Sequence, residues 1–337
     1  MAGLSFEPLC AETVGEHLAR RGLLDQGAAA VASELGGGVS SVVLAVRGGG
    51  LDVVVKQALP RLRVEEEWLA RRERALTEAA ALRLAAGLRP GTVPRVLDVD
   101  AESCAIVIER APVAWRPWQE LLLEGNADRE VAARVGSLLA SLHRGTAGDR
   151  EVAASFADVE VFDQLRVDPY YRALARRWPS LARALGGYVD QLERTRVCLV
   201  HAGCAPENVL VGEEGLWLLD FEVAHVGDPA FDLAFMLGHL MLKAIHRPAA
   251  SARYRACAAG FVDAYEAERG AAVASDPEYV LGHAGCLMVA RVDGRAPAEY
   301  LTPSERLAAR AAGTRLLLDP PATLAAAWTL LDEAVAG

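Results

Sequence analysis

The stretch LVHAGCAPENVLVGEEGLWLLDFE, residues 199–222, carries more information about the fold than any other part of the chain. Two short apolar runs in it, Val209–Val211 and Leu216–Leu219, are joined by Gly-Glu-Glu-Gly, and this pattern predicts a β-hairpin. Asn208 stands directly before the hairpin and Asp220 directly after it, so we expect the two side chains to be neighbours. Amide and carboxylate oxygens are suitable ligands for Mg²⁺, and the pair is therefore a candidate metal site.

Glu222 leaves two alternatives open. It lies two residues after Asp220 and, in an extended segment, points to the same side. It is either a second metal ligand or a carboxylate that faces solvent.

Lysine is rare in this chain. Of the 35 basic residues only Lys56 and Lys243 are lysines, and the rest are arginines. A position that stays lysine in such a background indicates a need for a compact ammonium group instead of a planar guanidinium. Lys56 ends the β-like run VVVK, 18 residues after Gly38. A lysine at a strand end can simply face solvent, but the composition and the preceding glycines favour a role in a binding site.

A glycine-rich segment comes before two β-like runs. The runs, Val39–Val46 and Leu51–Lys56, are separated by three glycines, which predicts a second hairpin. The segment in front of them, LGGGVSSVV, contains Gly36, Gly37, Gly38 and Ser40. Backbone N–H groups in such a segment can approach phosphate groups. The alternative is a flexible turn without a ligand.

Glu78 falls on an apolar stripe of a charged helix that we predict over residues 64–86. Ala75, Leu82 and Ala85 share its helix face, and a carboxylate there is costly unless it is paired. Lys56 is the natural partner. The other charged residues of this region are expected to form a solvated face: Glu65, Glu66, Glu67, Arg71, Arg72 and Arg74.

The remaining patterns divide the chain into a β-rich part and a helical part. We predict an opening helix over 13–24, strands over 96–99 and 104–109, and a proline-containing linker over 110–117. Helices are predicted over 131–142 and 170–195, the latter interrupted near Pro179 and Gly186, with about five more after Pro229. The expected fold class is α+β and two-lobed, with a small lobe of residues 1–111 and a larger helical lobe of residues 112–337.

Composition limits the classes of partner. The chain has a net charge of -10 and a pI near 5.3, which argues against nucleic acid and mildly favours cationic or neutral small ligands. No apolar run reaches membrane-spanning length, and the N-terminus has no signal-peptide pattern. Six scattered cysteines without CxxC spacing fit reduced thiols and a cytoplasmic location. The oligomeric state cannot be predicted from these features.

Taken in order, these segments resemble the aminoglycoside phosphotransferase-like kinases, which have a protein-kinase-like fold. The matching segments run from LGGGVSSVV through VVVKQALPRLRVEEEW, ERALTEAAAL, IVIERAP and HAGCAPENVLV to LLDFEVAHVGDPAFDLA. The stretch VVKQALPRLRV and the triplet DFE are most similar to methylthioribose kinase-like members. The resemblance implies an ATP-dependent phosphotransferase that acts on a hydroxyl of a small molecule.

The resemblance also implies roles for individual residues. Lys56 would hold ATP phosphates together with the glycine-rich segment, and Glu78 would orient Lys56. Asn208 and Asp220 would hold Mg²⁺, with Glu222 as a further ligand. His201 would support the catalytic loop and Asp232 would brace it. The adenine-binding hinge would be formed by Ile108, Glu109 and Ala111.

The chain departs from the family at the catalytic base. Members read HGD where this chain reads HAG, so Gly203 stands in place of the catalytic Asp, and Ala202 replaces a glycine. Three interpretations remain: an active kinase with another base, Glu222 or Glu207; a nucleotide-binding pseudokinase; or different nucleotide chemistry such as adenylyl transfer. The acceptor and the preference for ATP over GTP are not indicated, although the helical part should supply the acceptor pocket.

Overall fold

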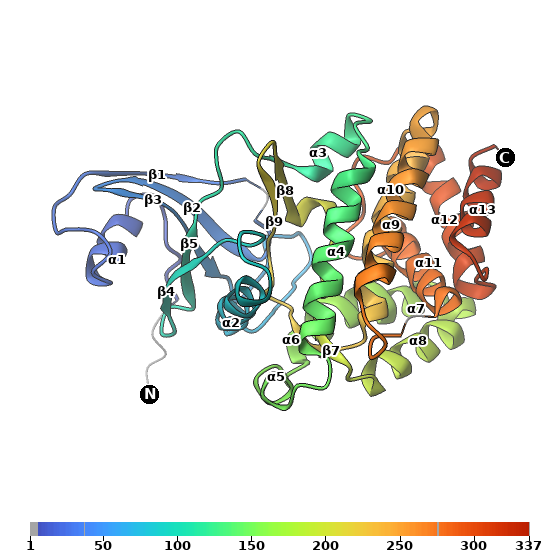
Figure 1. Ribbon diagram of the computed structural model, residues 1–337, viewed down its shortest axis with the longest axis horizontal. Helices are drawn as coiled ribbons and strands as arrows, with labels where there is room; N and C mark the ends of the chain where they lie inside the picture. Colours follow the sequence, from blue (N-terminus) through green and yellow to red (C-terminus); the bar gives the residue numbers. More distant parts are fainter. Residues whose placement is uncertain (1–5, 37, 275, 337) are drawn as a thin grey trace.

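The computed structural model describes residues 6–36, 38–274 and 276–336. A five-stranded antiparallel sheet and a mainly helical part lie next to each other along the long axis of the molecule (Figure 1). The strand order in the sheet is β1-β2-β3-β5-β4. The strands are β1 (Ala30–Glu34), β2 (Ser41–Gly48), β3 (Leu51–Ala58), β4 (Val96–Asp100) and β5 (Ala105–Glu109).

The β2–β3 hairpin forms as predicted from its glycines. Gly48, Gly49 and Gly50 all have positive φ, and Gly48 pairs with Leu51 at the end of the ladder. Alternate residues of β2 and β3 pack against helix α1 (Val14–Arg20), which is shorter than the predicted opening helix. The hairpin thereby fixes the position of Lys56 near the end of β3.

Helix α2 (Arg74–Leu88) begins ten residues later than predicted. The segment before it is irregular, because Trp68 is buried and the backbone N–H of Leu62 bonds to the Trp68 carbonyl. Glu65, Glu66 and Glu67 are exposed as expected. The expectation that Arg74 belongs to this solvated face is wrong, since its side chain is fully buried.

The helical part contains the five C-terminal helices that were predicted, within the described ranges. The elements before them are α3 (Trp118–Leu123), α4 (Arg129–Thr146), α5 (Arg150–Ser155), α6 (Glu160–Phe162), a π-helix (Asp163–Arg172), α7 (Ala173–Arg177) and α8 (Ala182–Arg194). The five that follow are α9 (Pro229–His246), α10 (Ser251–Glu268), α11 (Pro277–Asp293), α12 (Pro303–Leu318) and α13 (Leu324–Ala336). The predicted break at Gly186 is wrong, because α8 continues through it.

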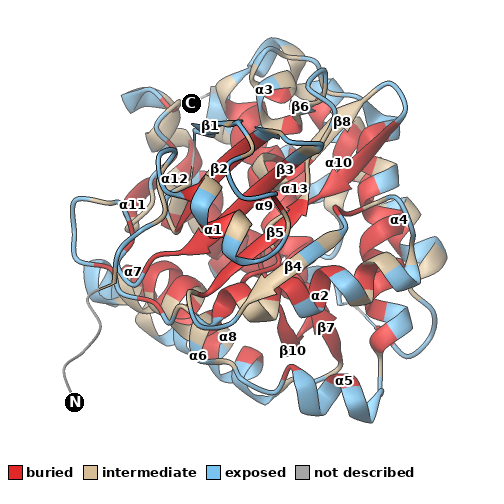
Figure 2. Ribbon diagram, turned by 90° about the vertical axis from the view of Figure 1, so that its left-hand side faces the viewer, coloured by how far each residue is buried: buried red, intermediate tan, exposed pale blue. Residues whose placement is uncertain are grey.

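Helix α9 is the centre of the helical part. Every residue from Pro229 to Ile245 is buried, and Figure 2 shows α9 in the interior of the molecule. Its neighbours in the core are α10, α11 and α12. Polar residues on α9, among them Asp232 and Lys243, are therefore held inside the protein.

Short strands connect the two parts. The predicted hairpin is present as β8 (Val209–Gly212) and β9 (Gly215–Leu218), with β6 (Arg116–Pro117) at its edge, and it lies between the sheet and α4 (Figure 1). Strand β7 (Cys198–Val200) pairs with β10 (His225–Gly227) and leads into the 201–208 loop. No helix in the described ranges has the length and apolar character needed to cross a membrane. A lobe boundary at residues 111–112 remains a prediction.

Candidate active site

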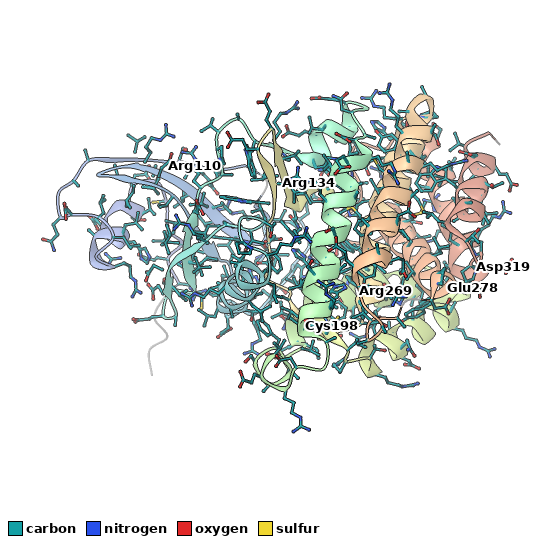
Figure 3. The ribbon with its side chains drawn as sticks, viewed as in Figure 1. Arg110, Arg134, Cys198, Arg269, Glu278 and Asp319 are labelled. Atoms are coloured by element: carbon teal, nitrogen blue, oxygen red, sulfur yellow. The ribbon has the colours of Figure 1, made fainter. Side chains whose placement is uncertain are left out.

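A cleft of about 2290 Å³ lies between the sheet and the helical part. It is lined by the glycine-rich segment, the ends of β3 and β5, the β8–β9 hairpin, and residues of α9 and α11. In Figure 3, Arg110 marks the sheet side of this region, and Cys198 marks the start of the 199–208 segment at the foot of α4.

Lys56 is bound between two carboxylates at the floor of the cleft. Its ammonium lies 2.9 Å from the carboxylate of Glu78 and donates a hydrogen bond to Asp220. Lys56 and Glu78 are buried, so the predicted pairing of a carboxylate on the apolar stripe is present. Burial opposes the charge on Lys56, but Asp220 and Glu78 outweigh it and raise the pKa of Lys56. The ammonium in turn lowers the pKa of Asp220, although burial opposes this.

Asn208 and Asp220 lie next to each other at the open end of the hairpin, as the sequence predicts. Asn208 comes directly before its first strand, and the Leu219 N–H donates to the Asn208 carbonyl at 2.8 Å. Asp220 has φ 69°, a left-handed conformation that costs energy for an aspartate and is frequent at functional sites. The Asn208 amide donates to the Gly203 carbonyl at 2.9 Å, which leaves the Asn208 side-chain oxygen free of any hydrogen bond from the described residues. The donor set therefore fits a hard cation such as Mg²⁺.

Glu222 is neither solvent-facing nor free. It is buried, and its carboxylate lies 3.0 Å from the Arg74 guanidinium. Arg74 also donates to the carbonyls of Leu59, at 2.9 Å, and of Ser40. Sequence reasoning missed Arg74; the signal was its i, i+4 spacing to Glu78, which places both on one helix face.

Glu222 still belongs to the acidic group at the cleft floor. One oxygen each of Glu78, Asp220 and Glu222 lie within 4.8 Å of one another. All three carboxylates have a cationic partner, but the Asp220 side chain is 27% exposed, against 3% for Glu78 and 5% for Glu222, so Asp220 is the carboxylate that a metal ion in the cleft can reach.

Asp232 holds the 201–208 loop in place. Its carboxylate accepts the backbone N–H groups of His201 and Ala202, both at 2.7 Å. His143 of α4 lies 3.1 Å from the same carboxylate. The His201 ring lies 2.9 Å from the Leu219 carbonyl, and burial lowers the pKa of His201, so the ring is neutral. These contacts agree with a supporting role for His201.

The position of the missing aspartate is filled from another element. A Cβ on Gly203 would lie 2.8 Å from Nη2 of Arg166, a residue of the π-helix. Arg166 is fixed by hydrogen bonds to the carbonyls of Ala202, at 2.6 Å, and Leu165, at 2.9 Å. Ala202 has φ 58°, a left-handed conformation that glycine adopts without steric cost, at the position where the family resemblance leads one to expect glycine. No pattern in the sequence pointed to Arg166, since it precedes Gly203 by 37 residues.

The glycine-rich segment and the predicted hinge both line the cleft. Gly36, Gly38 and Ser40 do so on one side, and Gly37 lies outside the described residues. A Cβ on Gly38 would lie 2.6 Å from the Ser41 carbonyl, so this backbone approach requires glycine. The expected hinge residues also line the cleft: Ile108, Glu109 and Ala111. Their roles in nucleotide binding remain predictions.

Comparison with known proteins gives relatives at low identity. Methylthioribose kinase of Geobacillus sp. (strain WCH70) is 26% identical over 271 residues, covering 72% of this chain and 68% of the relative. Methylthioribose kinase of Yersinia pestis (strain Pestoides F) is 25% identical over 246 residues, and this match spans only 60% of that enzyme.

Solved structures share the fold. A choline/ethanolamine kinase family protein from Mesorhizobium loti has a TM-score of 0.54 at 17% identity, covering 96% of this chain and 99% of its own. Amicoumacin kinase, solved with AMP-PNP, Ca²⁺ and Ami, has a TM-score of 0.53 at 14% identity, covering 91% and 94%. The fold is therefore protein-kinase-like and two-lobed, as predicted. The model of the phosphotransferase enzyme family matches residues 31–274, well over half of the 337 residues, and the chain belongs to that family.

Proposed function

We propose that this protein is a kinase that transfers the γ-phosphate of ATP to a hydroxyl group of a small molecule. The observation that carries the proposal is Lys56, which is held between Glu78 and Asp220 at the floor of the cleft. Burying a lysine with two carboxylate partners costs desolvation free energy, and a role in phosphate binding would account for that cost. We also propose a cytoplasmic location, where ATP is available and the unpaired cysteines stay reduced.

The nucleotide and the metal ion would bind on the sheet side of the cleft. Lys56 and the glycine-rich segment would contact the phosphates, and Ile108, Glu109 and Ala111 would contact the adenine. Asp220 and Asn208 would hold Mg²⁺, which neutralises charge on the phosphates when it is bound. The relative solved with AMP-PNP and Ca²⁺ supports this assignment.

Of the two glutamates considered as replacement bases, the contacts favour Glu207. Glu222 is held by the buried Arg74, so its carboxylate is not free to turn toward an acceptor hydroxyl. Glu207 lines the cleft, and burial opposes its ionisation while nearby cationic groups lower its pKa. Phosphoryl transfer depends mainly on positioning and charge stabilisation, so a weak base is compatible with turnover. A well-placed general base contributes about 10²–10⁴-fold, which sets the scale of the loss at Gly203.

One observation favours a second function, that of a nucleotide-binding pseudokinase. Arg166 occupies the space into which a side chain at residue 203 would project. A cation at this point replaces the carboxylate that accepts the hydroxyl proton in related kinases. In that case the protein would bind the nucleotide and act through its conformation or its partners.

Calorimetry with ATP, with and without Mg²⁺, tests the nucleotide site. We expect binding only with the metal, and loss of metal dependence in Asp220→Ala. Lys56→Arg should weaken binding, because a planar guanidinium does not replace the point charge. Equal affinity with and without Mg²⁺ would contradict the metal assignment.

ATP consumption in the presence of sugars, amino alcohols and sugar acids separates the two functions. A kinase should show slow, metal-dependent turnover with at least one acceptor class, reduced by Glu207→Gln. Tight binding of ATP without turnover in the presence of any of the three acceptor classes would establish the pseudokinase function.

A further inference from the structure

The two sides of the cleft differ in how their cations are paired. On the nucleotide side, Lys56 contacts the carboxylates of Glu78 and Asp220, and Arg74 contacts Glu222. Each buried cation there has a carboxylate partner within the protein. The three carboxylates of this side outnumber the two cations by one, which leaves room for a metal ion beside the phosphates of the proposed nucleotide.

On the acceptor side, three cations have no such partner. Arg166 of the π-helix, Lys243 of α9 and Arg291 of α11 make no ion pair within 4.0 Å with any carboxylate of the described residues. Arg291 donates to the Ala296 carbonyl at 2.7 Å. The nearest polar contact of Lys243 is the side-chain oxygen of Gln119, at 3.4 Å. Arg166 and Arg291 line the cleft, and Lys243 lies behind its wall.

The polar groups around these cations are incompletely satisfied. Lys243 is 0% exposed, and burial lowers its pKa to about 8. The buried Nε of Arg291 and the Tyr300 hydroxyl have no hydrogen-bond partner among the described residues. The two ring nitrogens of His239 also lack one, although Nδ1 lies 3.3 Å from the Glu207 carboxylate. Unpartnered buried polar groups are costly, and in native proteins they often mark the site of a ligand.

The cations lie close together. Burial lowers the pKa of His239 to about 3, and the charges of Lys243, Arg291 and Arg166 contribute to the shift. His239 is therefore neutral at neutral pH. Lys243 follows it by four residues on the same face of α9, and the Arg166 guanidinium lies 5.6 Å from the centre of the Phe235 ring, which is 5.1 Å from the His239 ring. Glu207 lies beside His239, and Asp220, which Arg166 also influences, is shared with Lys56 and Glu78. Counted together with that group, four cations face three carboxylates, which leaves one positive charge in excess.

We propose that the acceptor is a small molecule with an anionic group, a carboxylate or a phosphate monoester, bound by Arg166 and Arg291 in front of the buried Lys243. Guanidinium groups bind both anions in a bidentate manner, and Tyr300 and Arg291 Nε supply further donors. The hydroxyl that receives the phosphoryl group would then face Asn208 and Gly203. The proposal rests on the proposed kinase function. It also differs from the preference for cationic ligands that the net charge suggests, because local charges outweigh the total.

A matched series of three-carbon compounds tests this proposal: glycerol, glycerate and glycerol 3-phosphate, with choline as a small cation. Each is titrated by calorimetry into protein saturated with Mg²⁺ and AMP-PNP, so that the nucleotide site is already filled. We expect binding of glycerate, of glycerol 3-phosphate or of both, and none of glycerol or choline. The two anions distinguish a carboxylate from a phosphate site. Binding of choline, or of neither anion at millimolar concentration, would overturn the proposal.

Substitutions of Lys243 and Arg291 test whether these residues bind the anion. Arg291→Met should weaken binding of the anion about ten- to hundredfold, the usual effect of losing a charged hydrogen bond. Lys243→Met should weaken it less, because Lys243 lies behind the wall of the cleft and acts through its charge alone. Arg255→Met is the matched control, because Arg255 pairs with Asp332 on the outside of α10 and does not line the cleft. Equal affinity in all three variants would refute the assignment.

Thermal unfolding without added anion separates a binding role from a structural one. Lys243→Met should leave the midpoint unchanged or raise it, because the substitution removes a buried charge that has no partner. A clear fall would mean that Lys243 stabilises the fold itself, and would overturn its role as an anion-binding group. AMP-PNP binding is measured first in every sample, and the anion titration is repeated without nucleotide. Failure of the kinase proposal is thereby distinguished from failure of this one.

Discussion

Arg166 and Gly203 lie side by side in the loop where the family resemblance predicts the catalytic aspartate. The guanidinium Nη2 lies 2.8 Å from where the Cβ of residue 203 would be, and the same guanidinium donates a hydrogen bond to the Ala202 carbonyl. The loss of the aspartate is therefore more than the absence of a group, since a cation has replaced it. An aspartate introduced at residue 203 would lie beside Arg166 and not in the usual surroundings of a catalytic base.

Gly203→Asp should raise ATP turnover by less than about tenfold, well short of the range of about 10²–10⁴ for a positioned base. The new carboxylate would pair with Arg166 instead of accepting a proton from the acceptor. Steady-state ATP consumption measures the effect. The backbone is no obstacle, because positive φ occurs at Ala202 and not at Gly203.

The double variant Gly203→Asp, Arg166→Met provides the control. It should exceed the single Gly203→Asp variant in turnover if pairing with Arg166 is the obstacle. A large gain from Gly203→Asp alone would show that Arg166 moves aside.

Helix α2 joins the sheet to the cleft through one buried ion pair. Arg74, its first residue, donates to the carbonyls of Leu59 and Ser40 and pairs with Glu222. The helix start is therefore fixed from three directions. Glu78, one turn later, is placed against Lys56 as a result.

Arg74→Met should lower the free energy of unfolding by about 3–5 kcal/mol, because it leaves the Glu222 carboxylate buried and unpaired. Arg71→Met is the matched control on the same segment. Its ion pairs with Asp158 and Glu160 are exposed, so losing them should lower the free energy of unfolding far less than the loss of the buried pair. Urea unfolding measures both, and equal losses would contradict the buried pair as the cause.

Much of the site could be predicted from local patterns, and the rest depends on long-range packing. The hairpins followed from glycine spacing, and the Lys56–Glu78 pair followed from a carboxylate on an apolar stripe. Arg74 was misassigned because a run of charged residues resembles a solvated face. Arg166 reaches the loop only because the π-helix packs beside it, and no spacing in the sequence encodes that contact.

At the scale of the whole molecule, buried neutral histidines connect stability to pH. Burial lowers the pKa of His225 to about 4 and that of His283 to about 3. In the unfolded chain each histidine binds its proton near pH 6.5. The unfolded state then holds more protons than the folded state between about pH 6.5 and 4, so the free energy of unfolding falls as pH falls through this window.

Each such histidine should contribute a slope of up to about 1.4 kcal/mol per pH unit. Urea unfolding at several pH values between 7 and 4 measures the total slope. His283→Phe should reduce this slope, because it removes one of these two buried histidines. A stability that does not change over this window would mean that these histidines are protonated in the folded state.

Helix α9 fixes the distance between Asp232 and Lys243. Asp232 in its first turn braces the loop, and Lys243 lies eleven residues later, which is three turns along the same helix face and about 16 Å further along its axis. A single-residue insertion between them would rotate one end against the other by about 100° and would disturb both sites at once. Whole turns could be added or removed without that rotation. The distance between the 201–208 loop and Lys243 can therefore change without rotating one against the other only in steps of one helical turn, which is about 5 Å.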